Sequence, residues 1–380
     1  MKRLDREKLA AAIEQRAERD LLEAHVGGAT VMVAQAGEVV YQNHFFEKNS
    51  PWQGLGDHTL FRLASMTKPI TAAATLLLVE RGVLALEDTV DRFYPAFAAM
   101  QVHCADGTLT QANNKITVKS LLTHSSGIGC GAVWNANVGK WITQADKESV
   151  ESYVAFLSRL PLSFEPETKQ EYSGTGAFSV LTGIVQKVTD MPMEDFLRRE
   201  IFTPCCMQDA TFLPTEAQWA RLVPMHDRAE GKSVLGKTWA GCVFETTPAQ
   251  NFLGGAGLIA GAQDYLHFAQ MLLNGGVFEG RRVLAEASVA ALSKPRVFKK
   301  ESESWGLGVR VITKQAPLTV GSYGWSGAYG THFWVDPTEQ IIGLYMKNSR
   351  YDGGSGAVTS RNFENDVYQA LQDGEKAVQV

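Results

Sequence analysis

The chain has 380 residues, a formal net charge of -5 and 45% hydrophobic residues, a composition typical of a globular protein with one large domain or two moderate ones. No block of like charges occurs, so the sequence lacks both the basic footprint of nucleic-acid binding and a polybasic membrane patch. No stretch approaches the roughly 18 apolar residues that span a bilayer. We therefore expect a small-molecule partner, with neither nucleic acid nor membrane involved.

The first 27 residues alternate apolar and charged positions at helical spacing, which predicts a surface helix that ends near Gly27. This segment lacks the unbroken apolar core and small-residue cleavage site of a secretory signal. The cysteines are odd in number, include an adjacent pair and show no C-x-x-C metal spacing. Together these features favour a reduced, cytoplasmic setting. The five cysteines are Cys104, Cys130, Cys205, Cys206 and Cys242.

The chain then changes from strand patterns to helix patterns. Residues 29–46 alternate around an Ala-Gly turn, which predicts a β-hairpin. An alanine-rich apolar run follows, and it predicts a buried helix that begins near Ser65. Residues 83–249 contain mostly helical stretches that are broken by polar and proline-bearing loops.

The last third of the chain returns to strands. Residues 254–276 form a glycine-rich approach to a helix that ends at Asn274 and Gly275. The stretches WGLGVRVIT, HFWVDP and QIIGLYMKN predict strands, the last two joined by the turn DPTE, and a final helix covers residues 358–373. We therefore predict an α+β fold in which both chain ends build one antiparallel sheet flanked by helices. The predicted domains are 1–82 with 250–380 for the sheet and 83–249 for a mainly helical insertion, with the active site at their interface.

A serine and a lysine, Ser65 and Lys68, stand three residues apart at the start of the predicted buried helix. Side chains three apart on a helix are neighbours, so the lysine can reach the serine, and Pro69 is tolerated in the first turn. The helix dipole and burial both disfavour a charged amine there, so the pKa of Lys68 should fall and the amine should act as a base. The free backbone N–H at Ser65 would stabilise an oxyanion.

The S-x-x-K tetrapeptide alone has low specificity, because about one is expected by chance in a chain of this composition. A helix cap at Ser65 and a surface lysine at 68, with its stem lying over apolar residues, explain the pair equally well. The surrounding motifs must therefore decide between the two interpretations.

Five longer motifs follow one another along the chain in a fixed order. They are LFRLASMTKPITA, LLTHSSGIG, FEPETKQEYSGTGAFSVLTGIV, GGAGLIAGAQDYLHFAQMLLNGG and YGWSGAYGTHFWVDP. Together they resemble the serine hydrolases of the class C β-lactamase and penicillin-binding-protein type, and most closely the family VIII carboxylesterases. The resemblance covers nearly the whole chain and implies a β-lactamase-like fold.

The resemblance also implies catalytic roles for three residues. Ser65 matches the acylated nucleophile, Lys68 matches its partner base, and Tyr172 in EYSG matches a tyrosine that shares the proton with the lysine and passes it to the leaving group. An ammonium at hydrogen-bond distance would lower the pKa of this tyrosine from its ordinary value near 10. Without the resemblance, Tyr172 would be interpreted as an ordinary loop residue.

The WSG motif stands where β-lactamases of this type have lysine, threonine and glycine. By the same match, Trp325, Ser326 and Gly327 contact the substrate. The backbone N–H of Ala328 would complete an oxyanion hole with that of Ser65, on an edge strand that faces the helix start. Without the resemblance, WSG is a turning strand with a packed tryptophan.

Two departures from the β-lactamase pattern bear on the substrate. Trp325 removes the lysine that would meet the carboxylate of a β-lactam or peptide. Gly174 lies where β-lactamases carry an asparagine that contacts the substrate amide. Both changes favour a neutral ester.

Other motifs carry less functional weight. GAGLIA, residues 255–260, matches a loose dinucleotide pattern, but no βαβ unit surrounds it, so we interpret it as a tight packing site. The histidines show no metal-ligand spacing, and we expect a packing role for His124 and a pocket-lining position for His332. An apolar substrate pocket would draw on aromatic residues among Trp134, Trp141, Trp239, Phe244, Tyr329 and Trp334.

The sequence therefore predicts a serine carboxylesterase that cleaves small, short-acyl esters through an acyl-enzyme on Ser65 and requires no cofactor or metal. The alternatives are a β-lactamase, a D-amino-acid peptidase or an acyltransferase on the same scaffold. A catalytically silent binding module is a further alternative, since fold alone does not prove function. The presence of Ser65, Lys68 and Tyr172 favours an enzyme, while the acyl and alcohol preferences and the oligomeric state stay open.

Overall fold

The computed structural model describes residues 1–372 apart from residues 24, 49, 51, 53, 55, 105, 142, 144, 236–251 and 316. Trp239, Cys242 and Phe244, which the sequence singled out, lie outside the described residues. The four described cysteines are free thiols.

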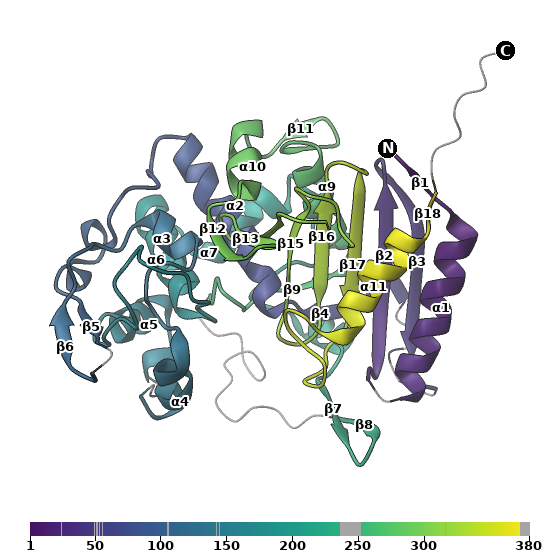
Figure 1. Cartoon of the computed structure of the whole chain (residues 1–380), viewed down its shortest axis with the longest axis horizontal. Coiled ribbons are helices and arrows are strands. Elements are labelled where there is room, and N and C mark those ends of the chain that lie inside the picture. The colour runs from purple at the N-terminus through teal and green to yellow at the C-terminus, as the bar shows by residue number, and fades with distance from the viewer. Residues whose placement is uncertain are drawn as a thin grey trace.

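An antiparallel sheet of eight strands organises the molecule (Figure 1). Its strand order is β12-β13-β14-β15-β16-β17-β2-β3, so the N-terminal hairpin continues a meander built from the last third of the chain. The junction pairs β17 with β2, with Gly343 opposite Val33. The predicted sheet made from both chain ends is therefore confirmed. The strands are β2 (Gly28–Gln35), β3 (Glu38–Phe46), β12 (Val297–Lys300), β13 (Glu303–Trp305), β14 (Arg310–Ile312), β15 (Tyr323–Ser326), β16 (His332–Asp336) and β17 (Ile341–Met346).

Each face of the sheet packs on its own helices, because successive side chains of a strand point to opposite faces. Met32 and Phe333 join the main core, together with side chains of α2 and α9. Val31 and Trp334 join a second core, together with side chains of α1 and α11. Figure 1 shows α1 and α11 side by side next to β2, β3 and β17. The helices are α1 (Arg6–Leu22), α2 (Thr67–Glu80), α9 (Ala262–Leu273), α10 (Glu286–Ser293) and α11 (Val358–Gln369).

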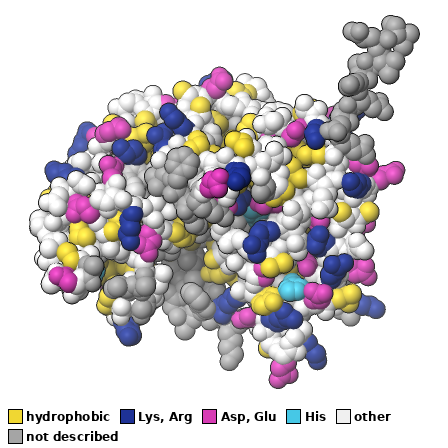
Figure 2. Space-filling view, in the orientation of Figure 1, with side chains coloured by type: hydrophobic (Ala, Val, Ile, Leu, Met, Phe, Trp, Pro, Cys, Tyr) yellow, Lys and Arg dark blue, Asp and Glu magenta, His cyan; other side chains and the backbone are white. Residues whose placement is uncertain are grey.

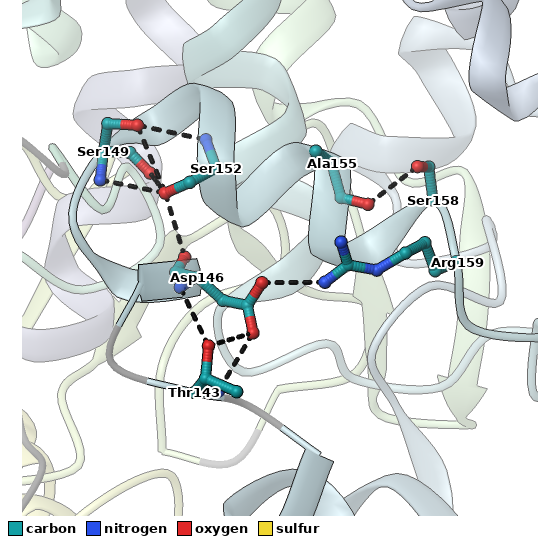
Figure 3. A network of polar contacts seen from close by, with 7 residues as sticks. All are labelled: Thr143, Asp146, Ser149, Ser152, Ala155, Ser158 and Arg159. Carbon is teal, nitrogen blue, oxygen red and sulfur yellow. Dashed lines mark hydrogen bonds and ion pairs between the residues drawn. The ribbon is translucent and has the colours of Figure 1, made fainter.

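The described chain between α2 and α9 is mainly helical, and its helices α3 to α7 lie away from β2 and β3 in Figure 1. Its helix α5 begins at a polar network drawn in Figure 3, where Ser149 and Ser152 form a capping box. In the same network Asp146 accepts hydrogen bonds from Thr143 and Arg159. The helices of this region are α3 (Val118–Leu122), α4 (Gly131–Trp141), α5 (Val150–Leu157), α6 (Gly176–Thr189), α7 (Met193–Leu197) and α8 (Glu216–Arg221), with a π-helical turn η6 (Arg198–Phe202).

Short paired strands and 3-10 turns complete the described structure. The paired strands are β1 (Arg3–Leu4) with β18 (Leu371–Gln372), β4 (Leu60–Arg62) with β9 (Ile259–Gly261), β5 (Gln101–His103) with β6 (Leu109–Gln111), β7 (His226–Ala229) with β8 (Lys232–Leu235) and β10 (Val277–Phe278) with β11 (Arg281–Arg282). The 3-10 turns are η1 (Gly56–His58), η2 (Ala64–Met66), η3 (Val90–Arg92), η4 (Pro95–Phe97) and η5 (Ala145–Lys147).

The observed elements agree with the predicted hairpin at 29–46 and with the helix that ends at Asn274. Four details of the prediction were wrong. The final helix ends at Gln369 rather than at residue 373, because the chain passes into strand β18. The first helix ends at Leu22 rather than near Gly27. The stretch WGLGVRVIT is not one strand but the last residue of β13, a turn and strand β14, because Gly308 has a left-handed φ of +83° that breaks an extended strand. Strand β15 lies between β14 and β16, so it is an interior strand and not an edge strand.

The surface in the orientation of Figure 2 carries Lys, Arg, Asp and Glu side chains that are interspersed rather than gathered by sign. Across the described part of the chain, none of the helices is both long enough and apolar enough to cross a membrane.

Candidate active site

Ser65 lies in the 3-10 turn η2, directly before helix α2. Two contacts fix the chain just ahead of it: the Leu63 N–H donates to the Leu258 carbonyl at 2.9 Å, and the Thr331 hydroxyl donates to the Leu63 carbonyl at 2.9 Å. Ala64, next to the serine, has a left-handed φ of +46°, which costs a non-glycine residue about 1 kcal/mol or more. The surrounding contacts therefore hold the serine in a strained turn at the start of a helix.

Lys68 is wholly buried in the first turn of α2, and its amine meets three oxygen atoms. Its Nζ lies 3.2 Å from Ser65 Oγ, 2.6 Å from the Gly174 carbonyl and 2.7 Å from the Gly255 carbonyl. Burial lowers the pKa of Lys68 well below its ordinary value, as the sequence predicted. In a neutral amine, two N–H groups can serve the two carbonyls, and the lone pair then faces the serine hydroxyl. Lys68 is thus arranged to accept the proton of Ser65.

Tyr172 approaches Ser65 from the other side of the serine. Its hydroxyl donates to Ser65 Oγ at 2.7 Å and accepts from the Trp325 indole N–H at 3.2 Å. The predicted fall in its pKa was wrong: burial raises the pKa of Tyr172 to about 12, although the bonds to Ser65 and Trp325 oppose this rise. The reason is geometric, because Lys68 Nζ lies over the tyrosine ring, 4.9 Å from its centroid, and its three hydrogen bonds go elsewhere.

Trp325 points from β15 to the same side of the sheet as Tyr172. The two ring centroids are 5.4 Å apart, and the indole N–H bond favours a negative charge on the tyrosine oxygen. In the sequence this tryptophan occupies the position of a lysine in the resembling β-lactamases. The structure places a neutral donor next to the tyrosine at this position.

Replacing Trp325 with phenylalanine should lower kcat/KM roughly tenfold, the effect of about 1.4 kcal/mol from one lost hydrogen bond. Loss of the donor removes a contact that stabilises the phenolate, and this raises the pKa of Tyr172. Any change of kcat/KM with pH that is due to Tyr172 should therefore move to higher pH. The measurement is kcat/KM for an ester against pH. Trp334→Phe is the matched control, because Trp334 packs in the second core near Phe363. Equal losses in both variants would contradict this role for Trp325.

Ser326, the middle residue of WSG, points to the opposite face of the sheet. Its hydroxyl lies 2.8 Å from His332 Nδ1, and His332 Nε2 lies 3.0 Å from a Glu364 carboxylate oxygen. Arg310 donates to the same oxygen of Glu364 at 2.8 Å. Burial raises the pKa of Glu364, but His332 and Arg310 more than offset this and bring it to about 2. The structure thus places Ser326 and His332 in a buried polar network rather than beside Ser65.

Gly327 and Ala328 begin the turn between β15 and β16, next to the serine segment. A Cβ added to Gly327 would collide with the Leu63 carbonyl, so this position requires glycine. Ala328 is exposed. The close approach keeps the Ala328 N–H a candidate partner of the Ser65 N–H in an oxyanion hole.

Several functional contacts escaped the sequence analysis. The carbonyls of Gly174 and Gly255 hold Lys68, and a Cβ added to Gly255 would lie only 3.1 Å from the Gly174 carbonyl. The GAGLIA motif is therefore a tight packing site, as predicted, and it also contacts the lysine. Trp305 was missed as well: its ring lies 4.4 Å from that of Trp325. A small cavity beside these rings is lined by Gln170, Tyr172, Glu303, Ser304, Trp305, Arg310 and Trp325.

The aromatic residues proposed for the pocket are distributed differently. Trp134 and Trp141 pack on each other near Phe156 in the helical region, and Trp334 lies in the second core. Trp239 and Phe244 lie outside the described residues. Within the described residues, no group of three or more His, Cys, Asp or Glu side chains is arranged to hold a metal ion.

Comparisons with known proteins found relatives in sequence and in fold. A family model described as Beta-lactamase matches residues 9–362. Esterase EstB of Burkholderia gladioli is 30% identical over 394 aligned positions, which cover 94% of each protein. Among solved structures, EstCE1, a hydrolase with promiscuous acyltransferase activity, superposes with a TM-score of 0.79 at 23% identity over 96% of this chain and 99% of its own. Simvastatin synthase from Aspergillus terreus superposes with a TM-score of 0.79 at 21% identity over the same shares of the two chains.

Proposed function

The chain belongs to the Beta-lactamase family, and we propose that it is a serine carboxylesterase that cleaves small, short-acyl esters through an acyl-enzyme on Ser65. The observation that carries the proposal is the wholly buried Lys68 amine, which lies 3.2 Å from Ser65 Oγ. A surface lysine or a simple helix cap would not be held in this way. The likeness to esterase EstB over 94% of both proteins supports an ester as the substrate class.

The reaction proceeds in two steps that balance their protons. Lys68 takes the proton of Ser65, whose oxygen attacks the ester carbonyl, and the N–H groups of Ser65 and Ala328 stabilise the oxyanion. Tyr172 gives its proton to the departing alcohol, which leaves an ammonium at Lys68 and a phenolate at Tyr172. Water then gives a proton to Tyr172 and attacks the acyl group, while the ammonium returns its proton to Ser65.

Short distances support this assignment of roles. Ser65 keeps 8% of its surface exposed while Lys68 keeps none, so a substrate can meet the serine but not the lysine. The Tyr172 hydroxyl lies 2.7 Å from the serine oxygen, close to where the alcohol of the ester departs. Trp325 and Gly327 form the wall on the β15 side, and a neutral ester suits this wall better than a carboxylate does.

An acyltransferase is the alternative that a specific observation favours. EstCE1 combines hydrolase and acyltransferase activity on the same fold, and an alcohol can replace water in the second step. A β-lactamase or D-amino-acid peptidase fits less well, because Trp325 stands in place of the cation that would meet a substrate carboxylate.

The proposal also includes a cytoplasmic location and a domain division at 82/83 and 249/250. The second boundary falls on residues that the structure does not describe.

The test compares p-nitrophenyl butyrate with nitrocefin as substrates of the purified protein. We expect steady ester turnover and a much smaller kcat/KM for nitrocefin. Labelling with a fluorophosphonate reports a reactive serine independently of either substrate. Nitrocefin turnover without ester turnover would make the protein a β-lactamase, and a protein that is neither labelled nor active would be a silent binding module.

A further inference from the structure

We propose that His124 is a positioning residue that clamps the chain on both sides of Tyr172 and so holds the tyrosine hydroxyl against Ser65. The inference deepens the proposed function and rests on it, because Tyr172 has a catalytic role only in that function. His124 lies in the THSSG segment that follows α3, far from Tyr172 in sequence, and it is 1% exposed.

The clamp consists of two hydrogen bonds that flank the tyrosine. The Glu171 N–H donates to the backbone carbonyl of His124 at 3.0 Å. The Ser173 N–H donates to His124 Nδ1 at 3.1 Å. One histidine thus binds the residue before Tyr172 and the residue after it. Because Nδ1 is an acceptor here, the neutral ring carries its proton on Nε2, and a second proton on Nδ1 would remove the bond to Ser173.

The histidine ring also fills the space behind the tyrosine ring. The two centroids are 4.6 Å apart, and the other contacts of the His124 ring include Trp305, which it stacks on at 4.9 Å with an interplanar angle of 18°. Tyr172 in turn contacts Trp325, with ring centroids 5.4 Å apart. These ring contacts restrict the tyrosine ring, so its hydroxyl is held in one direction, toward Ser65.

The backbone conformation of His124 supports a functional role for its side chain. Helix α3 ends in a Schellman motif, in which the Ser125 N–H donates to the Ser120 carbonyl at 2.9 Å and the His124 N–H donates to the Leu121 carbonyl at 3.4 Å. The residue in the position of His124 is usually glycine, and His124 has a left-handed φ of +56°. A histidine is therefore placed where glycine would cost less backbone strain, which is the kind of local cost found at functional sites.

The test uses two substitutions that both tolerate this backbone. His124→Gly relaxes the helix end but removes the acceptor and the ring, whereas His124→Asn accepts a left-handed φ and offers Oδ1 in place of Nδ1. We expect kcat for p-nitrophenyl butyrate to fall between roughly tenfold and a hundredfold in His124→Gly, with KM little changed. His124→Asn should recover most of this loss. His226→Asn, which alters another buried histidine, should match the wild type.

A double-mutant cycle with Tyr172→Phe separates positioning from general stability. If His124 acts through Tyr172, His124→Gly should cost less than about twofold in the Tyr172→Phe background. A loss that is as large in that background as in the wild type would overturn the proposal. Wild-type activity in His124→Gly would overturn it as well.

A structural readout keeps this inference distinct from the proposed function. In a crystal structure of His124→Gly, the Tyr172 hydroxyl should lie beyond hydrogen-bond distance of Ser65 Oγ, compared with 2.7 Å in the wild type. An unmoved tyrosine refutes the clamp whatever the enzyme hydrolyses. If the tyrosine moves but the wild type cleaves no ester, the clamp stands and only the ester assignment fails.

Discussion

Replacing Ser65 with alanine should lower kcat/KM for p-nitrophenyl butyrate at least about a thousandfold, the size expected when a nucleophile is deleted. The serine oxygen receives a hydrogen bond from Tyr172 at 2.7 Å and lies 3.2 Å from the Lys68 amine. No other described hydroxyl combines a buried amine and a phenol in this way. Alanine keeps the backbone N–H, so the oxyanion donor remains and only the attacking atom is lost.

The measurement is the initial rate for wild type and Ser65→Ala, purified in the same way, together with fluorophosphonate labelling of both. Ser179→Ala is the matched control, because Ser179 is also a buried serine and its hydroxyl bonds only within its own helix, to the Thr175 carbonyl at 2.9 Å. The control should retain full activity. If Ser65→Ala hydrolysed the ester as fast as the wild type, Ser65 would be a helix cap and another group would do the chemistry.

The parts of this site that the sequence predicts are those set by local geometry. Ser65 and Lys68 are three residues apart on a helix, so their contact follows from helix periodicity. Tyr172 is 107 positions away from Ser65, and only the resemblance to known hydrolases linked the two. The carbonyls of Gly174 and Gly255 carry no side-chain signal, so no residue pattern could assign them to Lys68. The clamp by His124 is equally non-local.

The wrong prediction for the pKa of Tyr172 has the same origin. The expected fall assumed that the lysine amine would meet the tyrosine oxygen. In the fold, Lys68 lies in the first turn of α2 and reaches two backbone carbonyls, so the buried phenol gains no cation at its oxygen. Burial is then the dominant effect, and burial raises the pKa of a phenol. The sign of such a shift depends on which atoms meet, which a sequence does not specify.

One error in the sheet was avoidable from the sequence. Trp325 and Ser326 are neighbours on a strand, so their side chains must point to opposite faces, and both cannot line one substrate site. The alternation implied that Ser326 would face the same side as a cross-strand partner such as His332, which the structure places at 2.8 Å from it. By contrast, the interior position of β15 depends on the order of strands in space, and no local pattern reports that order.

Replacing Lys68 should be nearly as damaging as replacing Ser65, with kcat/KM falling between roughly a hundredfold and ten-thousandfold. Lys68→Met keeps the length and the apolar stem but removes the base. Lys68→Arg keeps a cation but cannot lose its proton. Because catalysis needs the neutral amine, both variants should fail, whereas a lysine that served only as a positive charge would be replaced in part by arginine.

The pH dependence of the wild type should show whether Lys68 acts as a base. A base is active when deprotonated, so kcat/KM should rise with pH through the pKa of Lys68 in the folded protein. Burial lowers that pKa well below the ordinary value, and the rise should therefore be complete well below pH 10. The residual kcat/KM of Lys68→Met should not show this rise with pH. If Lys68→Arg retained activity within tenfold of the wild type with an unchanged profile, the lysine would act as a charge, and the base would have to be sought elsewhere.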